Sequence, residues 1–150
     1  MFLRVYQIVM LFLLFLLALA QGTYLFHQWT KVPRADLSHW RIEYASLNFD
    51  EDAAHVLEVQ LRAESSIIFK KSTLPQMEVL LTNIAGDPLA HRIFEPKEWV
   101  APDLPLKNDW LIYGVPSQTE ITIAMPLEIP KDASGFQVHL LYENTLNPKK

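Results

Sequence analysis

The sequence predicts an all-β domain, an antiparallel two-sheet sandwich of the immunoglobulin-like type with about seven strands, behind one amino-terminal transmembrane helix. Three observations lead to this prediction. Apolar and polar residues alternate along five segments of the chain. The 150 residues include 10 prolines, all beyond residue 32, which disfavours a helical bundle. The first 26 residues are mostly apolar, whereas the remainder has an ordinary globular composition.

The amino-terminal segment has the length and composition of a membrane span. Residues 5–26 contain no charged side chain, and Ile8–Ala20 is an unbroken apolar run. As a helix this segment would extend roughly 33 Å, about the hydrocarbon thickness of a bilayer. We therefore expect the lipid bilayer to hold residues 5–26, with residues 1–4 as a cytoplasmic stub. Four residues fall where charged and amphipathic aromatic side chains meet the headgroups: Arg4, Tyr24, Trp29 and Lys31.

The same segment also fits a cleaved signal peptide. Arg4 precedes the apolar run, and Ala18-Leu19-Ala20 has the pattern of a cleavage site. Hydrophobicity continues beyond that site through Phe26, which favours retention as an anchor. In both cases, an amino-terminal apolar segment directs the domain behind it out of the cytoplasm.

Beyond the span the pattern changes to that of β structure. Residues 27–39 are polar and contain Pro33, so we expect a short tether there. The apolar period then becomes two, as in half-buried strands. Strands are expected at 40–44, 57–61, 77–81, 89–94, 121–125 and 136–142. Turn residues separate them at Asp50-Glu51-Asp52, Ala85–Pro88 and Pro130–Gly135. The sandwich domain is thus expected over 40–143, followed by a polar tail at 144–150.

Residues 95–118 form a proline-rich stretch in which we expect irregular structure. Trp110–Tyr113 has the composition of a short edge strand, and no helix of useful length is expected after residue 40. Three aromatic side chains flank this stretch and are expected to form an interaction surface: Trp99, Trp110 and Tyr113. Capping of the core by the same rings is the alternative.

Arg92 is the polar strand residue that stands out. It lies close in sequence to Glu95 and Glu98, and such a group can form a structural ion pair that fixes the strand against the following loop. A solvent-facing strand arginine is the alternative.

Composition and motifs exclude several kinds of chemistry. The absence of cysteine removes disulfides, cysteine zinc sites and a thiol nucleophile. The five histidines show no metal-binding spacing, and no nucleophile elbow, P-loop or dinucleotide fingerprint occurs. A net charge of −4 disfavours nucleic acid as a partner. We expect no catalytic activity, no cofactor and no metal.

Three segments together show a resemblance to a known family. They are Leu74–Asn83, Ala85–Trp99 and Ala133–Tyr142. Their order resembles an uncharacterised proteobacterial family whose members carry a cytoplasmic zinc ribbon, a disordered linker, one transmembrane helix and a carboxy-terminal domain of unknown function outside. This chain matches the carboxy-terminal domain and the helix and lacks the zinc ribbon, since it has no cysteine. The resemblance implies a single-pass inner-membrane protein with its domain in the periplasm.

The function expected from these features is protein–protein interaction. The chain would be an accessory or assembly subunit of a cell-envelope complex, with an unidentified envelope protein as partner. One alternative is a secreted or periplasmic ligand-binding sandwich released after Ala20. Another is a truncated zinc-ribbon membrane regulator, for which the upstream reading frame would encode paired C-x-x-C motifs.

Overall fold

The computed structural model describes residues 2–49, 54–67 and 69–143. These residues form two compact units that meet in sequence between Val32 and Pro33. The expected turn at Asp50-Glu51-Asp52 and the expected tail at 144–150 lie outside the described residues. Each unit is described by itself.

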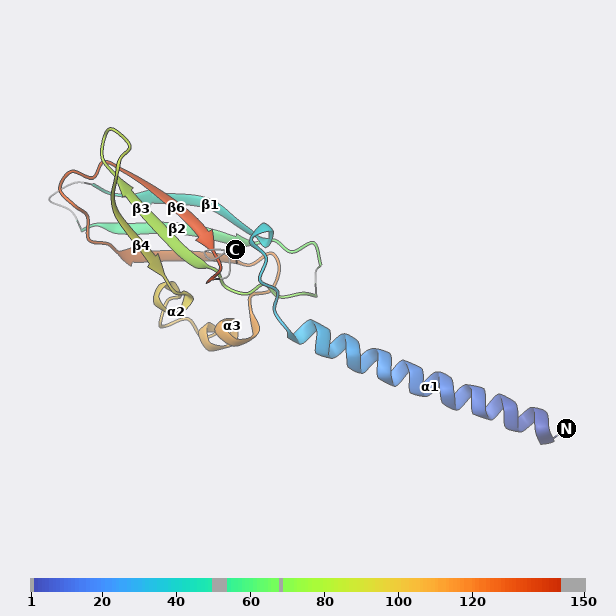
Figure 1. The fold of residues 1–150 in the computed structure, drawn as a ribbon. Coiled ribbons are helices and arrows are strands. Elements are labelled where there is room, and N and C mark those ends of the chain that lie inside the picture. The colour runs from blue at the N-terminus through green and yellow to red at the C-terminus, as the bar shows by residue number, and fades with distance from the viewer. Residues whose placement is uncertain (1, 50–53, 68, 144–150) are drawn as a thin grey trace. The chain divides into compact units, whose positions relative to one another are not determined.

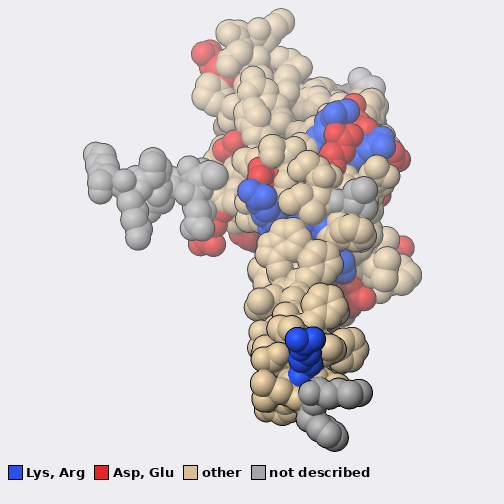
Figure 2. All heavy atoms as spheres, turned by 90° about the vertical axis from the view of Figure 1, so that its right-hand side faces the viewer, with Lys and Arg blue, Asp and Glu red and all other residues tan. Residues whose placement is uncertain are grey.

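The first unit is a single helix, α1 (Phe2–Lys31). It is long and apolar enough to cross a membrane. Arg4 and Lys31 are the only charged side chains of α1, and most of its surface is accordingly tan in Figure 2. The helix continues five residues beyond Phe26, where the expected span ends, and stops just before Pro33.

The second unit contains two three-stranded antiparallel sheets (Figure 1). One has the order β1-β2-β5 and the other the order β4-β3-β6. The strands are β1 (Trp40–Leu47), β2 (Val56–Ala63), β3 (Gln76–Thr82), β4 (Pro88–Phe94), β5 (Glu120–Pro126) and β6 (Gly135–Leu141). The described residues thus form six strands where about seven are expected, arranged in a sandwich-like fold.

The core lies between the two sheets. Alternate residues of the central strands are buried, which is the pattern the sequence predicts. Leu57 and Leu61 of β2 and Met77 of β3 are fully buried. The edge strand β1 has a bulge between Ile42 and Tyr44, a device that discourages pairing with a further strand.

The outward face of β1-β2-β5 carries charged side chains that pair with one another. Arg62 lies 3.4 Å from Glu43 and 3.3 Å from Glu120, and Arg41 lies 2.7 Å from Glu64. Cationic and anionic groups are interspersed on the domain face shown in Figure 2. Both arginines of this face are therefore engaged by carboxylates.

Residues 33–39 belong to the β domain rather than forming a free tether. The backbone N–H of Arg34 donates to the Lys71 carbonyl at 2.9 Å, and Thr73 N–H donates to the Arg34 carbonyl at 2.9 Å. Ser72 in turn pairs with Val115. A short 3-10 helix, η1 (Leu37–His39), then leads into β1. We call the end of the domain with the bridged residues Arg34, Ser72 and Val115 the base.

Two helices interrupt the proline-rich stretch, α2 (Pro96–Trp99) and α3 (Lys107–Tyr113), which both lie toward the base in Figure 1. The expected edge strand at Trp110–Tyr113 is therefore wrong. The N–H of Gly114 donates to the Trp110 carbonyl at 3.0 Å, and the positive φ of Gly114, 79°, ends the helix. The four residues Trp110–Tyr113 are aromatic or branched, a composition typical of a strand. The glycine that follows them caps a helix instead.

Candidate functional site

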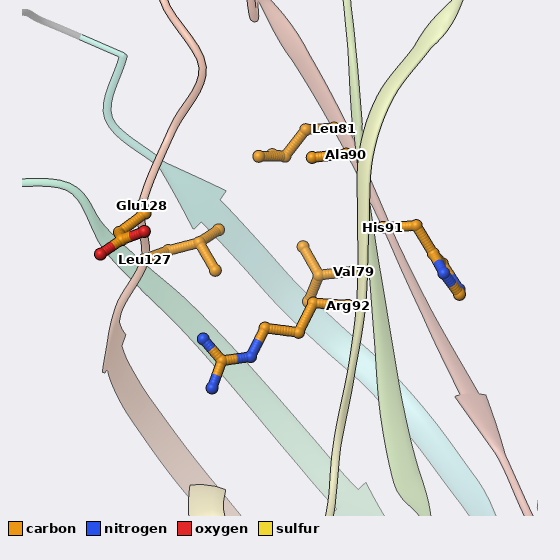
Figure 3. Close-up of a pocket in the computed structure, with 7 residues that line it drawn as sticks. All are labelled: Val79, Leu81, Ala90, His91, Arg92, Leu127 and Glu128. Atoms are coloured by element: carbon orange, nitrogen blue, oxygen red, sulfur yellow. The ribbon is translucent and has the colours of Figure 1, made fainter.

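A cleft of about 190 Å³ opens between the two sheets beside β4, which is one of the two edge strands of its sheet. Figure 3 shows β3 and β4 on one side and the chain that follows β5 on the other. Seven residues line it: Val79, Leu81, Ala90, His91, Arg92, Leu127 and Glu128. We call it the β4 cleft.

The alternation along β4 determines which of its side chains enter the cleft. Ala90 and Arg92 point between the sheets, whereas His91 points to the opposite side of the strand (Figure 3). The floor of the cleft is apolar, because it is formed by the side chains of Val79 and Leu127. These two residues are only 2 % and 8 % exposed. The small side chain of Ala90 leaves space that a larger residue at this position would fill.

Arg92 stands at the mouth of the β4 cleft and contacts two neighbours. Its guanidinium carbon lies 4.4 Å from the centre of the Phe94 ring, and Nη2 lies 3.8 Å from Oε1 of Glu98. The side chain of Arg92 is 59 % exposed, so the ion pair contributes little to stability. The cation is therefore accessible to a partner as well.

Of the expected ion-pair group of Arg92, Glu95 and Glu98, only Arg92 and Glu98 pair with each other. The Glu95 carboxylate accepts a hydrogen bond from the side chain of Gln76 instead. Glu98 also caps α2, since its Oε2 accepts from the Glu95 N–H at 2.7 Å. A glutamate at the third position of a helix that begins with proline is a capping signal readable in the sequence.

The expected aromatic interaction surface does not form as a unit. Trp99 is buried at 3 % exposure, and Trp110 packs against the core. Tyr113 is 50 % exposed. The alternative role, capping of the core, thus holds for both tryptophans, because α2 and α3 turn these rings inward over the end of the sandwich.

On the outward face of β4-β3-β6, one carboxylate joins two histidines. Glu78 Oε1 lies 2.7 Å from His91 Nε2, and Oε2 lies 3.2 Å from His139 Nδ1. The hydrogen bond from His91, followed by that from His139, lowers the pKa of Glu78. Within the described ranges, no group of three His, Cys, Asp or Glu side chains is arranged to hold a metal ion.

The Glu78 cluster predicts a stability that depends on acid pH. A carboxyl whose pKa is lowered by folding stabilises the domain above its unfolded pKa and loses that contribution as pH falls through the lower folded pKa. We expect Glu78→Gln to lower the free energy of unfolding by about 1 kcal/mol at neutral pH. The difference from the wild type should shrink below about pH 4 in urea titrations.

The matched control is Glu58→Gln, at an exposed position of β2. It should change the free energy of unfolding by less than about 0.5 kcal/mol. If the Glu78→Gln difference stayed constant down to pH 3, the histidine contacts would not be its source.

A comparison with protein-family models gives one match. The model of a protein of unknown function, DUF3426, matches residues 37–140. This chain belongs to the DUF3426 family. The match spans η1, strands β1 to β5 and all but the last residue of β6, and α1 lies outside it. Comparisons with curated proteins and with solved structures give no match.

At the base of the β domain, a serine, a histidine and an aspartate lie next to one another. Ser72 Oγ lies 3.2 Å from His39 Nδ1, and His39 Nε2 lies 3.7 Å from Asp36 Oδ2. Ser72 is completely buried, so its hydroxyl cannot meet a substrate carbonyl. The arrangement fixes the base instead, since Ser72 also pairs through its backbone with Arg34 and Val115.

A second set of hydrogen bonds joins the start of β1, the segment before β3 and the residue after β6. Tyr142 donates its hydroxyl to the Thr73 carbonyl at 2.6 Å, and Trp40 Nε1 donates to the same carbonyl at 3.1 Å. Burial raises the pKa of the Tyr142 phenol. Sequence reasoning missed this group because its members are far apart along the chain.

The four residues expected at the membrane interface lie on α1, outside the DUF3426 match: Arg4, Tyr24, Trp29 and Lys31. All four side chains are exposed. Three fall in the last two turns of the helix, where the Trp29 and Phe26 rings are 6.0 Å apart. An aromatic pair followed by a lysine is the arrangement typical of a helix end at the headgroup layer.

Proposed function

We propose that this chain is a single-pass inner-membrane protein whose β domain lies in the periplasm and binds another envelope protein. It acts as an accessory or assembly subunit and performs no catalysis. The apolar helix α1 supplies the anchor, and the DUF3426 domain supplies the binding surface.

The observation that carries this proposal is the β4 cleft. An unpaired edge strand next to an apolar cleft suits the addition of an extended segment from a partner. Main-chain hydrogen bonds give such a complex its affinity, and a side-chain pocket gives it specificity. A cavity of about 150 Å³ accommodates benzene, so the β4 cleft, at about 190 Å³, suits one aromatic or branched side chain.

The alternative of a released ligand-binding sandwich differs from the anchored protein at its amino terminus. The mass of the mature chain tests the anchor directly, because cleavage after Ala20 leaves a chain that begins at Gln21. An intact amino terminus supports the anchored protein, and a start at Gln21 contradicts it.

The test of partner binding uses a photocrosslinking amino acid at position 90, inside the β4 cleft. The full chain would be expressed in its own host and irradiated in living cells. We expect a crosslinked adduct with another envelope protein. The matched position is Ala124, which is exposed on β5. Equal adducts from both positions, or none from position 90, would contradict the proposal.

Filling the cleft supplies an independent check. Ala90→Phe is expected to occupy the space that the partner side chain needs and to reduce the adduct, detected from a crosslinker at position 92, at least about tenfold. The cleft is open, so the thermal midpoint of unfolding should fall by less than about 5 °C. An unchanged adduct would show that the partner binds elsewhere.

A further inference from the structure

The base of the β domain exposes apolar side chains that its own core does not use. On α3, Ile112 is 65 % exposed and Tyr113 is 50 % exposed, while Leu106 just before it is 51 % exposed. On the loop between β2 and β3, Phe69 is 70 % exposed. Water solvates such groups poorly, and both segments that carry them lead into the bridged residues of the base.

Only a short stretch of chain separates the end of α1 from the bridged residues of the base. Tyr113 is two residues from Val115, Phe69 is three residues from Ser72, and both of these bridge residues belong to the base. Arg34 of the same bridge is three residues beyond the end of α1 at Lys31. Three residues reach at most about 10 Å and each bridge adds about 5 Å, so the α-carbons of Phe69 and Tyr113 lie within about 30 Å of Lys31 along this path.

We propose that Phe69 and the Leu106–Tyr113 segment enter the interface of the bilayer that α1 spans, so that the domain rests on the membrane. This proposal rests on the anchor of the proposed function. The partner is the lipid surface, since apolar and aromatic side chains are the groups that insert at the boundary of headgroups and acyl chains. The β4 cleft then remains open to a protein partner along the side of the sandwich.

The exposed apolar residue at the other end of the domain provides the contrast. Ile84 is 96 % exposed in the turn between β3 and β4, at the end opposite to α3 in Figure 1. Its apolar character equals that of Ile112, but its place in the chain does not bring it near α1. The proposal therefore predicts different surroundings for two isoleucines of similar exposure.

The test uses the absence of cysteine in the chain, which permits labelling at single introduced positions. Full-length chains with Phe69→Cys, Ile112→Cys, Ile84→Cys or Leu13→Cys would carry an environment-sensitive fluorophore. Each would be reconstituted into vesicles of phosphatidylcholine and phosphatidylglycerol, with and without brominated acyl chains. Cooperative thermal unfolding would be required of every labelled chain.

We expect brominated lipid to remove about half of the emission at positions 69 and 112, and almost none at position 84. The label at position 13 reports whether α1 is inserted. Quenching at 13 without quenching at 69 and 112 overturns this inference and leaves the anchor intact. No quenching at 13 contradicts the anchor itself. A blue-shifted but unquenched label at 112 would mean that protein covers α3, which also overturns the inference.

Discussion

Aspartate in place of both Leu13 and Leu14 is expected to abolish membrane association of the chain. Both leucines lie within α1 and are more than half exposed, at 54 % and 57 %. Each Leu to Asp exchange near the centre of a span costs about 3 kcal/mol of insertion free energy, so the pair costs about 6 kcal/mol. The measurement is the fraction of full-length chain that remains with membranes after carbonate extraction.

Alanine at the same two positions is the matched control for this experiment. It shortens both side chains without introducing charge, so the chain should stay in the membrane fraction. If the aspartate variant resisted extraction as well as the alanine variant, α1 would not be what holds the protein to the membrane.

Gly114→Ala is expected to lower the free energy of unfolding of the β domain by about 3 kcal/mol. The φ of Gly114 is +79°, a value that costs an L-residue about 1–2 kcal/mol. A β-carbon there would lie 2.7 Å from the Ser72 carbonyl oxygen and 2.7 Å from the β-carbon of Pro33. Neither contact can be relieved by rotating a flexible side chain, so the bridge at the base must shift.

Gly86→Ala separates the backbone strain of a positive φ from the steric clash of the added β-carbon. Gly86 has a similar φ of +87°, but its added β-carbon meets no atom within 4 Å. This control should lose only the strain of about 1–2 kcal/mol. Urea unfolding of the wild type and both variants measures the difference. Equal losses would mean that the close approach at Gly114 has no energetic consequence.

The strands could be predicted from the sequence because burial on one face produces a period of two. In β2, Leu57 and Leu61 are fully buried while Glu58 between them is exposed. The two-sheet arrangement follows from the number of such strands. Residues 33–39 were less predictable, because their polar composition does not reveal that Arg34 pairs with a segment almost forty residues later.

Helix α3 shows why a local pattern can mislead. Trp110–Tyr113 is aromatic and branched, which favours a strand, and seven residues are too few for a helical period to become visible. The readable signal was Gly114 directly after the last apolar residue, a common position for a helix-capping glycine. Trp99 and Trp110 were accordingly expected at the surface, although α2 and α3 direct them toward the core.

The candidate site depended on register and packing that a single sequence does not contain. Arg92 and Glu98 are close along the chain, and their pairing could be anticipated. Glu78 meets His139 only because β3 and β6 pair in one particular register. Likewise, the β4 cleft exists because Ala90 of one sheet faces Leu127 beyond the edge of the other.

The attachment at Arg34 also has a mechanical consequence. A pull on the chain at residue 32 first loads the two backbone hydrogen bonds that Arg34 makes with Lys71 and Thr73. These two bonds would yield under less force than the seven-residue pairing of β2 with β5, which supports the core. Tension between a membrane anchor and a bound partner would therefore lengthen the chain between α1 and the domain by a few residues before any strand separates. The Arg34 pairing would open first, and the strands of the sandwich would stay paired.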